Sequence, residues 1–80
     1  MNRYRIRYFA ILREQRGLAT ATHASDAADA LTLYQELRDT YGFTLPADRL
    51  RAAVNGEFVP WPTPLSDHDE VVFIPPVAGG

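Results

Sequence analysis

The amino-acid sequence predicts an α+β fold in which a mixed sheet of about four to five strands wraps around one main helix. Two observations support this prediction. Segments with the two-residue periodicity of β-strands stand on both sides of a single long amphipathic stretch. The most apolar strand comes last, which favours a central position with one face under the helix. In a chain of 80 residues, this order of elements is typical of the β-grasp fold.

The N-terminal segment alternates charged and apolar side chains. Residues 3–9 read Arg-Tyr-Arg-Ile-Arg-Tyr-Phe, a strict period of two. Tyr4, Ile6 and Tyr8 therefore point to one face of a strand. The three arginines and Phe9 point to the other face. This pattern predicts a half-buried strand.

Two shorter elements are predicted next. Residues 10–16 are good helix formers that stop at Gly17, a residue that often ends helices, so a short helical turn is expected. In residues 18–24, Ala19, Ala21 and His23 alternate with Leu18, Thr20, Thr22 and Ala24. That alternation predicts a second strand, which would follow the helical turn directly.

The main helix is predicted from its ends and its apolar stripe. Ser25 and Asp26 can serve as the N-cap, and the Asp29 carboxylate suits the positive end of a helix. Gly42 is well placed to end it. Between these ends, apolar residues recur at spacings of three and four, as on one face of an amphipathic helix. They are Ala30, Leu33, Tyr34, Leu37 and Tyr41.

The C-terminal half contains a hairpin and the last strand. Residues 43–48 are expected to form a loop. Residues 51–59 predict a hairpin because their central Asn-Gly pair favours the positive φ angles of a tight turn. The three prolines of residues 60–64 exclude a central strand, and Trp61 is expected to pack against the domain. After a polar turn, residues 70–74 form a strongly apolar last strand.

The chain ends in a distinctive tail, Pro75-Pro76-Val77-Ala78-Gly79-Gly80. Two prolines stiffen the exit from the last strand, because each fixes φ near −65°. Gly79 and Gly80 lack side chains and can thread a narrow channel. The functional interpretation is a Gly80 carboxylate presented to an enzyme that activates it, and the competing one is a frayed end. We expect a single domain over residues 1–80, with residues 76–80 as an exposed, flexible tail.

Composition excludes several classes of function. A net charge of −2 gives no field that favours nucleic acid or an anionic membrane, and no apolar run reaches the roughly 20 residues of a membrane span. Without a signal sequence at the N-terminus, the expected location is the cytoplasm. The chain has no cysteine and no lysine, and His23 and His68 are too far apart for a zinc pattern, so no metal site is expected. It also has no glycine loop that could hold a phosphate.

Four groups of residues carry a resemblance to a known family, which covers most of the chain. They are Phe9-Ala10-x-Leu12-Arg13-Glu14 with Gly17, Ala52-Ala53-Val54-Asn55-Gly56, Pro64-Leu65-x-Asp67-x-Asp69-Glu70-Val71, and Phe73-x-Pro75-Pro76-Val77-x-Gly79-Gly80. With them, the sequence resembles the small sulfur-carrier subunits of molybdopterin synthase, which are ubiquitin-like proteins. One departure is His68, where the family usually has glycine.

The resemblance implies a sulfur-transfer cycle on Gly80, with Gly79 beside it. An adenylating, E1-like enzyme would activate the Gly80 carboxylate with ATP. Sulfur from a sulfurtransferase would then replace AMP to give a thiocarboxylate. The large subunit of molybdopterin synthase would use that sulfur to build the molybdopterin dithiolene of the molybdenum cofactor. The chain itself would be a carrier with no bound cofactor, and the catalytic groups would lie on the large subunit.

The resemblance also implies a docking surface for the large subunit. Phe9, Phe58 and Ile74 would lie on the open face of the sheet, as an apolar patch ringed by arginines. A one-residue slip in the hairpin would reverse Phe58, and alternation alone leaves open that some of these residues belong to the core. The expected partner-binding residues are Phe9, Phe58, Ile74, Pro75, Pro76 and Val77.

Other functions fit the same tail. A carrier of this type could feed cysteine or thiamine synthesis or tRNA thiolation, because the tail indicates the sulfur chemistry and not its destination. A ubiquitin-like modifier would instead join Gly80 to lysines of other proteins, and a plain β-grasp binding module would tolerate loss of the tail. The ending and the Phe9 motif favour molybdopterin.

Overall fold

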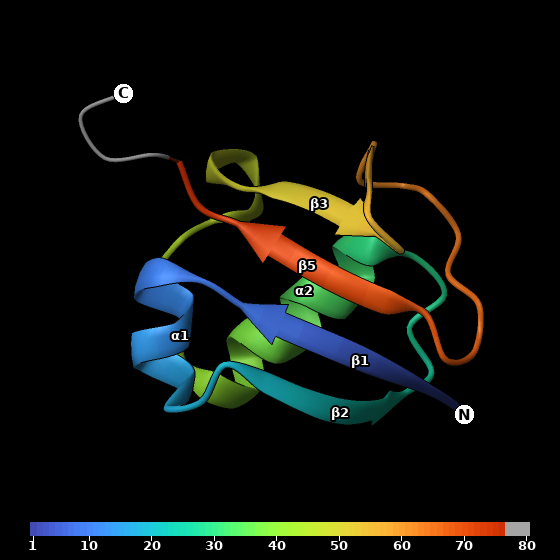
Figure 1. Cartoon of the computed structure of the whole chain (residues 1–80), viewed down its shortest axis with the longest axis horizontal. Helices are drawn as coiled ribbons and strands as arrows, with labels where there is room; N and C mark the ends of the chain where they lie inside the picture. Colours follow the sequence, from blue (N-terminus) through green and yellow to red (C-terminus); the bar gives the residue numbers. More distant parts are fainter. Residues whose placement is uncertain (77–80) are drawn as a thin grey trace.

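The computed structural model describes residues 1–76 and shows a five-stranded mixed sheet wrapped around one main helix (Figure 1). This confirms the predicted β-grasp arrangement. In chain order, the elements within the described residues are β1 (Asn2–Tyr8), α1 (Ala10–Arg16), β2 (Thr20–Ser25), α2 (Ala30–Tyr41), the 3₁₀ turn η1 (Ala47–Arg49), β3 (Arg51–Val54), β4 (Glu57–Val59) and β5 (Glu70–Ile74).

The last strand lies in the middle of the sheet, as its apolar character predicts. The strand order is β2-β1-β5-β3-β4. β5 pairs in parallel with β1 and antiparallel with β3, while the β1–β2 and β3–β4 pairs are antiparallel. A central strand is shielded on both edges, so its near-continuous apolar run is stable there. The first and last strands, β1 and β5, are therefore neighbours in the interior of the sheet.

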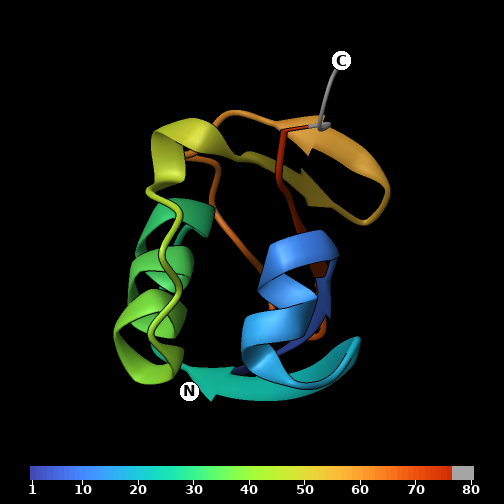
Figure 2. The ribbon, with the colours of Figure 1, turned by 90° about the vertical axis from the view of Figure 1, so that its left-hand side faces the viewer.

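The main helix α2 covers one face of the sheet, and no helix among residues 1–76 covers the opposite face (Figure 2). Tyr4, Ile6 and Tyr8 of β1 share one face, as their alternation predicts, and the structure places this face under α2, where they are at most 2% exposed. Leu12 of α1 closes one end of the core. None of these helices is long and apolar enough to cross a membrane, within the part of the chain that the structure describes.

Aromatic rings form the centre of the core. The ring centroids of Tyr34 and Phe73 are 5.0 Å apart, which joins the middle of α2 to β5. Trp61 stacks on Phe73 at 6.0 Å and 11°, so the proline-rich segment packs against the domain as expected. Phe43 closes the cluster against Tyr34 at 6.2 Å. Such pairs add specific geometry to the large apolar area that each ring buries.

The start of α2 differs from the prediction. Asp29 is the N-cap, and its Oδ1 accepts a hydrogen bond of 2.8 Å from the Thr32 amide. Ser25 instead ends β2, where it pairs with Asn2 and its Oγ accepts from the Ala27 amide. Pairing with β1 keeps Ser25 extended, and an isolated bridge between Asp29 and Pro64 keeps the residue before the helix extended. The predicted N-cap at residues 25–26 was therefore wrong.

The predicted loop over residues 43–48 was also partly wrong. Its last two residues belong to η1, which follows Pro46. The Leu50 amide donates to the Ala47 carbonyl and closes this turn. Leu50 itself is buried in the core, 5% exposed. Burial of Leu50 explains why the chain turns before β3 begins.

The turn before β5 places a histidine in a left-handed conformation. His68 has φ of 69°, in the region that favours glycine. Its amide donates to the Arg3 carbonyl over 2.8 Å, which fixes the turn to the start of β1. The side chain is 79% exposed and contributes little packing. Its backbone conformation therefore costs stability without a compensating contact to the core.

We predict that His68→Gly stabilises the fold. Glycine adopts positive φ without steric cost, so the free energy of unfolding should rise by about 0.5–1 kcal/mol. Urea unfolding followed by circular dichroism measures this change. His68→Ala is the control, because alanine keeps a Cβ and should give no gain. An equal gain for both variants would contradict the explanation by backbone strain.

A side-chain contact fastens the edge strand β2 to α2. Nε2 of His23 donates a hydrogen bond to Oε2 of Glu36. This hydrogen bond is the main reason that the pKa of the Glu36 carboxyl lies below its ordinary value of 4.5. In the unfolded chain Glu36 binds a proton more readily. The contact therefore stabilises the fold fully above pH 4.5, and this stabilisation disappears as pH falls through the lower pKa of the folded state.

Glu36→Gln should consequently change the acid sensitivity of the fold. Between about pH 5.5 and about pH 3, the difference in unfolding free energy between the wild-type chain and the variant should shrink. Urea unfolding at several pH values measures this difference, and the other carboxylates cancel in the comparison. A difference that stays constant over this range would show that the contact makes no pH-dependent contribution.

Candidate functional site

The face of the sheet opposite α2 carries the candidate site. We call it the open face. Cross-strand pairs place side chains on the same side of a sheet, so the register identifies its members. They are Arg3, Arg5 and Arg7 of β1, Thr20, Thr22 and Ala24 of β2, Glu70, Val72 and Ile74 of β5, Arg51 and Ala53 of β3, and Phe58 of β4.

The centre of the open face is apolar, and its side chains are short. Val72 and Ala53 pair across β5 and β3 and are 8% and 7% exposed, although neither belongs to the core cluster under α2. Phe58 lies beside them on β4 and is 60% exposed. Phe9 follows β1 in an extended conformation, so it points away from the core and is 41% exposed. The patch thus has a flat aliphatic centre between two protruding rings.

The tail leaves the sheet at one end of this face. Pro75 follows β5 directly and is buried, whereas Pro76 is exposed. A hollow of about 580 Å³ opens at this exit, between η1, the start of β3 and the β4 side chains. It is lined by Asp48, Arg49, Leu50, Arg51, Phe58, Ile74, Pro75 and Pro76. The buried proline holds the direction in which the chain leaves the sheet.

The structure brings most of the predicted partner-binding residues together. Phe58, Ile74, Pro75 and Pro76 line the hollow at the tail exit. Phe9 lies one residue beyond the Tyr8–Phe73 pair, so the parallel register places it beside Ile74. Their role in partner binding stays a prediction. Val77, Gly79 and Gly80 lie outside the described residues.

Sequence reasoning missed two contributors to this region. η1 forms one wall of the hollow, where a loop was expected. Arg51 joins the open face and stacks on Phe58, with its Cζ 4.6 Å from the ring centroid. The alternation of Arg51 and Ala53 in β3 carried a signal for this position. That signal becomes useful only when the pairing of β3 with β5 fixes which face the alternation refers to.

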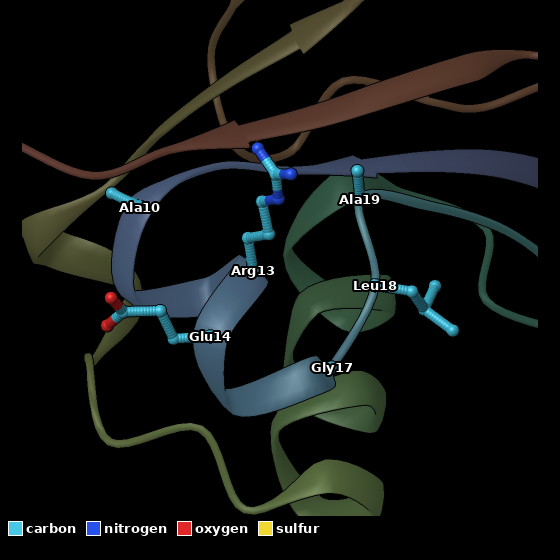
Figure 3. Close-up of a pocket in the computed structure, with 6 residues that line it drawn as sticks. All are labelled: Ala10, Arg13, Glu14, Gly17, Leu18 and Ala19. Carbon is cyan, nitrogen blue, oxygen red and sulfur yellow. The ribbon is translucent and has the colours of Figure 1, made fainter.

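A second hollow, of about 480 Å³, lies between α1 and the start of β2 (Figure 3). Arg13 points toward the sheet there, while Glu14 and Leu18 point away from it. Several of its residues belong to the N-terminal motif noted above. The Gly17 end of α1 has φ of 85°, and its amide donates to the Arg13 carbonyl. The motif thus contains both ends of α1, the N-cap Phe9 and the C-cap Gly17.

The titratable groups do not form a metal centre in the region of residues 1–76. No group of three or more His, Cys, Asp or Glu side chains there could hold a metal ion. His23 is engaged with Glu36, and Nε2 of His68 lies 3.3 Å from a carboxylate oxygen of Asp67.

Comparison with known proteins identifies the family. The model of the ThiS family matches residues 6–80, a range that begins within β1 and includes the terminal Gly-Gly. The chain belongs to the ThiS family. It is also 37% identical over 79 residues to the molybdopterin synthase sulfur carrier subunit of Escherichia coli (strain K12), covering 95% of this chain and 98% of that protein.

Solved structures share the fold of this ThiS-family chain. SAMP1 from Haloferax volcanii matches with a TM-score of 0.79 and 23% identity, over 99% of this chain and all of its own. The complex of subunits 1 and 2 of molybdopterin-converting factor from Helicobacter pylori 26695 contains a chain that matches with a TM-score of 0.68 and 24% identity. That match covers 98% of this chain and 99% of the other. At these identities the likeness establishes the fold.

Proposed function

We propose that this chain is the sulfur-carrier subunit of a molybdopterin synthase and works in the cytoplasm. The observation that supports this most is the 37% identity, over nearly the whole chain, to a sulfur carrier subunit of that enzyme. The family match, which extends to Gly80, supports a role for the terminal residue. The chain would carry sulfur, and the large subunit would supply the catalytic groups.

The proposed chemistry takes place at the Gly80 carboxylate. An E1-like enzyme joins this carboxylate to AMP from ATP and releases pyrophosphate, because a free carboxylate is a poor electrophile. The outer sulfur of a persulfide on a sulfurtransferase then attacks the acyl-adenylate and displaces AMP. A thiol reduces the resulting acyl disulfide and leaves a thiocarboxylate. The thiocarboxylate sulfur is a good nucleophile toward the pterin precursor. The chain has no lysine and no cysteine, so its own side chains offer no amine or thiol to capture the activated end.

The open face supports docking of this chain to the large subunit. Phe9, Phe58 and Ile74 form a partly exposed apolar patch next to the tail exit. A partner bound there would lie beside the place where Pro75 and Pro76 direct the chain out of the sheet. The related Helicobacter pylori chain occurs in a complex of subunits 1 and 2, which supports a two-subunit assembly here.

Loss of the end residue should abolish sulfur loading. We predict that deleting Gly80, or adding one residue after it, prevents the gain of about 16 Da that replacement of oxygen by sulfur gives. Mass spectrometry after incubation with the activating enzyme, ATP and a sulfur source measures this gain. The melting temperature should change by less than about 2 °C, because residues 77–80 follow the last strand.

A one-residue extension at the N-terminus is the matched control and should load normally. Sulfur loading by the chain without Gly80 would rule out the proposed role of the tail. Isopeptide remnants of Gly80 on other proteins in the host would favour the modifier. Reconstitution with the large subunit and the pterin precursor separates molybdopterin synthesis from the other sulfur pathways.

Charge at the centre of the patch should disrupt docking. We predict that Ile74→Asp weakens binding to the large subunit by at least about 2 kcal/mol, because a carboxylate would be buried against apolar side chains. Isothermal titration calorimetry measures the dissociation constant. Ile11→Asp is the matched control, since Ile11 is 36% exposed on α1, away from the open face. Equal dissociation constants for Ile74→Asp and the wild-type chain would exclude this face as the docking surface.

A further inference from the structure

Positive charge is concentrated on the open face, although the chain as a whole has a net charge of −2. The register places four exposed arginines there, Arg3, Arg5, Arg7 and Arg51. Glu70 is the one carboxylate among the strand residues of this face in the described chain. Asp67 lies near Arg3 at the far end, and Asp48 lines the hollow beside Arg51. Such a separation of charge steers partners with the opposite sign.

Two of these arginines are stacked on the exposed rings. Cζ of Arg7 lies 5.6 Å from the centroid of Phe9, and Cζ of Arg51 lies 4.6 Å from the centroid of Phe58. Stacking on a ring holds the guanidinium plane and leaves its N–H edge free to donate. Arg7 has only a loose contact with Glu70, 3.9 Å between nitrogen and oxygen. Both arginines can therefore donate hydrogen bonds to a carboxylate of a partner.

The two Arg–Phe pairs flank the aliphatic centre of the open face. Arg7 is on β1 and Arg51 is on β3, with β5 between them. Arg7 pairs with Val72 and Arg51 pairs with Ile74. Two strand spacings and this offset of two residues separate their backbones by roughly 12 Å. Val72 and Ile74 of β5 lie on the strand between them, and Ala53 lies two residues from Arg51 on β3. The surface is thus apolar in the middle and cationic on both sides.

We propose that the protein partner of the open face presents an apolar side chain flanked by two carboxylates. The apolar group contacts Val72, Ala53 and Ile74, and each carboxylate pairs with the guanidinium of one Arg–Phe pair. Arg7 and Arg51 then select partners by charge, while the aliphatic centre contributes buried area. This inference rests on the proposed docking function and specifies the chemistry of the surface that docks.

Single-stranded RNA is the competing occupant, because exposed aromatic rings and arginines on a sheet also bind nucleic acid. Two observations favour protein. A guanidinium already lies over each ring, where a base would stack. The aliphatic centre offers neither a ring for stacking nor a hydrogen-bonding group for a base. An acidic protein surface with an apolar knob satisfies all parts of the face at once.

The test compares the double variant Arg7→Gln/Arg51→Gln with the wild-type chain. The probe is the large subunit of molybdopterin synthase from the same organism, titrated at about 50 mM and about 500 mM NaCl, where screening differs strongly. The dissociation constant of the wild-type chain should rise about tenfold between low and high salt. At low salt, the double variant should bind about tenfold more weakly than the wild-type chain, and high salt should weaken its binding little further. Circular dichroism checks that the variant is folded.

Arg38→Gln is the matched control, because it removes one positive charge from α2, on the covered side of the sheet. Its binding and salt dependence should match the wild-type chain. Equal salt dependence in the double variant and the wild-type chain overturns the inference and leaves the docking function intact. No binding of the wild-type chain at either salt overturns both. The same titration is repeated with a uridine 12-mer as the probe. The inference is also overturned if this RNA binds the wild-type chain more tightly than the large subunit does and does not bind the double variant.

Discussion

The pairing of β5 with β1 on one edge and β3 on the other is the constraint on which the rest of the structure depends. It pairs the backbone N–H and C=O groups of the most apolar strand on both edges. It also gives the two faces of this strand different environments. Val71 and Phe73 enter the core under α2, and Phe73 contacts both Tyr34 and Trp61. Val72 and Ile74 reach the open face. Because β5 is also the last strand, the same pairing fixes where the tail begins and which surface lies beside it.

The proposed function uses this coupling of core, surface and chain end. A carrier whose reactive group is its own terminus requires a scaffold that presents the end and a surface that aligns it with an enzyme. The buried Pro75 directly follows the central strand β5, and the same strand contributes Val72 and Ile74 to the open face. Arg7 and Arg51 border that face and add charge selection to its apolar area. Recognition and sulfur transfer then depend on neighbouring parts of one element.

Much of the fold follows from local patterns in the sequence. The period of two in β1 predicted that Tyr4, Ile6 and Tyr8 share one face of a half-buried strand, because alternate side chains of a strand must point to opposite faces. The Asn-Gly pair predicted the β3–β4 hairpin for a similar local reason. The cap of α2 was predicted wrongly. Ser25 and Asp26 are suitable caps by type, but Ser25 is paired with β1 and Asp29, which bridges to Pro64, is the N-cap.

The sequence by itself determined the alternation within each strand, the central place of the last strand and the motif that ends in Gly80. Only the tertiary structure decided how the alternations combine. Phe58, Arg51 and Ile74 share a face because the β3–β4 and β3–β5 registers place them there, and a shift of one residue would reverse each strand. The packing of α2 then selects which face is covered. Side-chain parity is a local property of a strand, whereas register and burial depend on contacts between residues far apart in the chain.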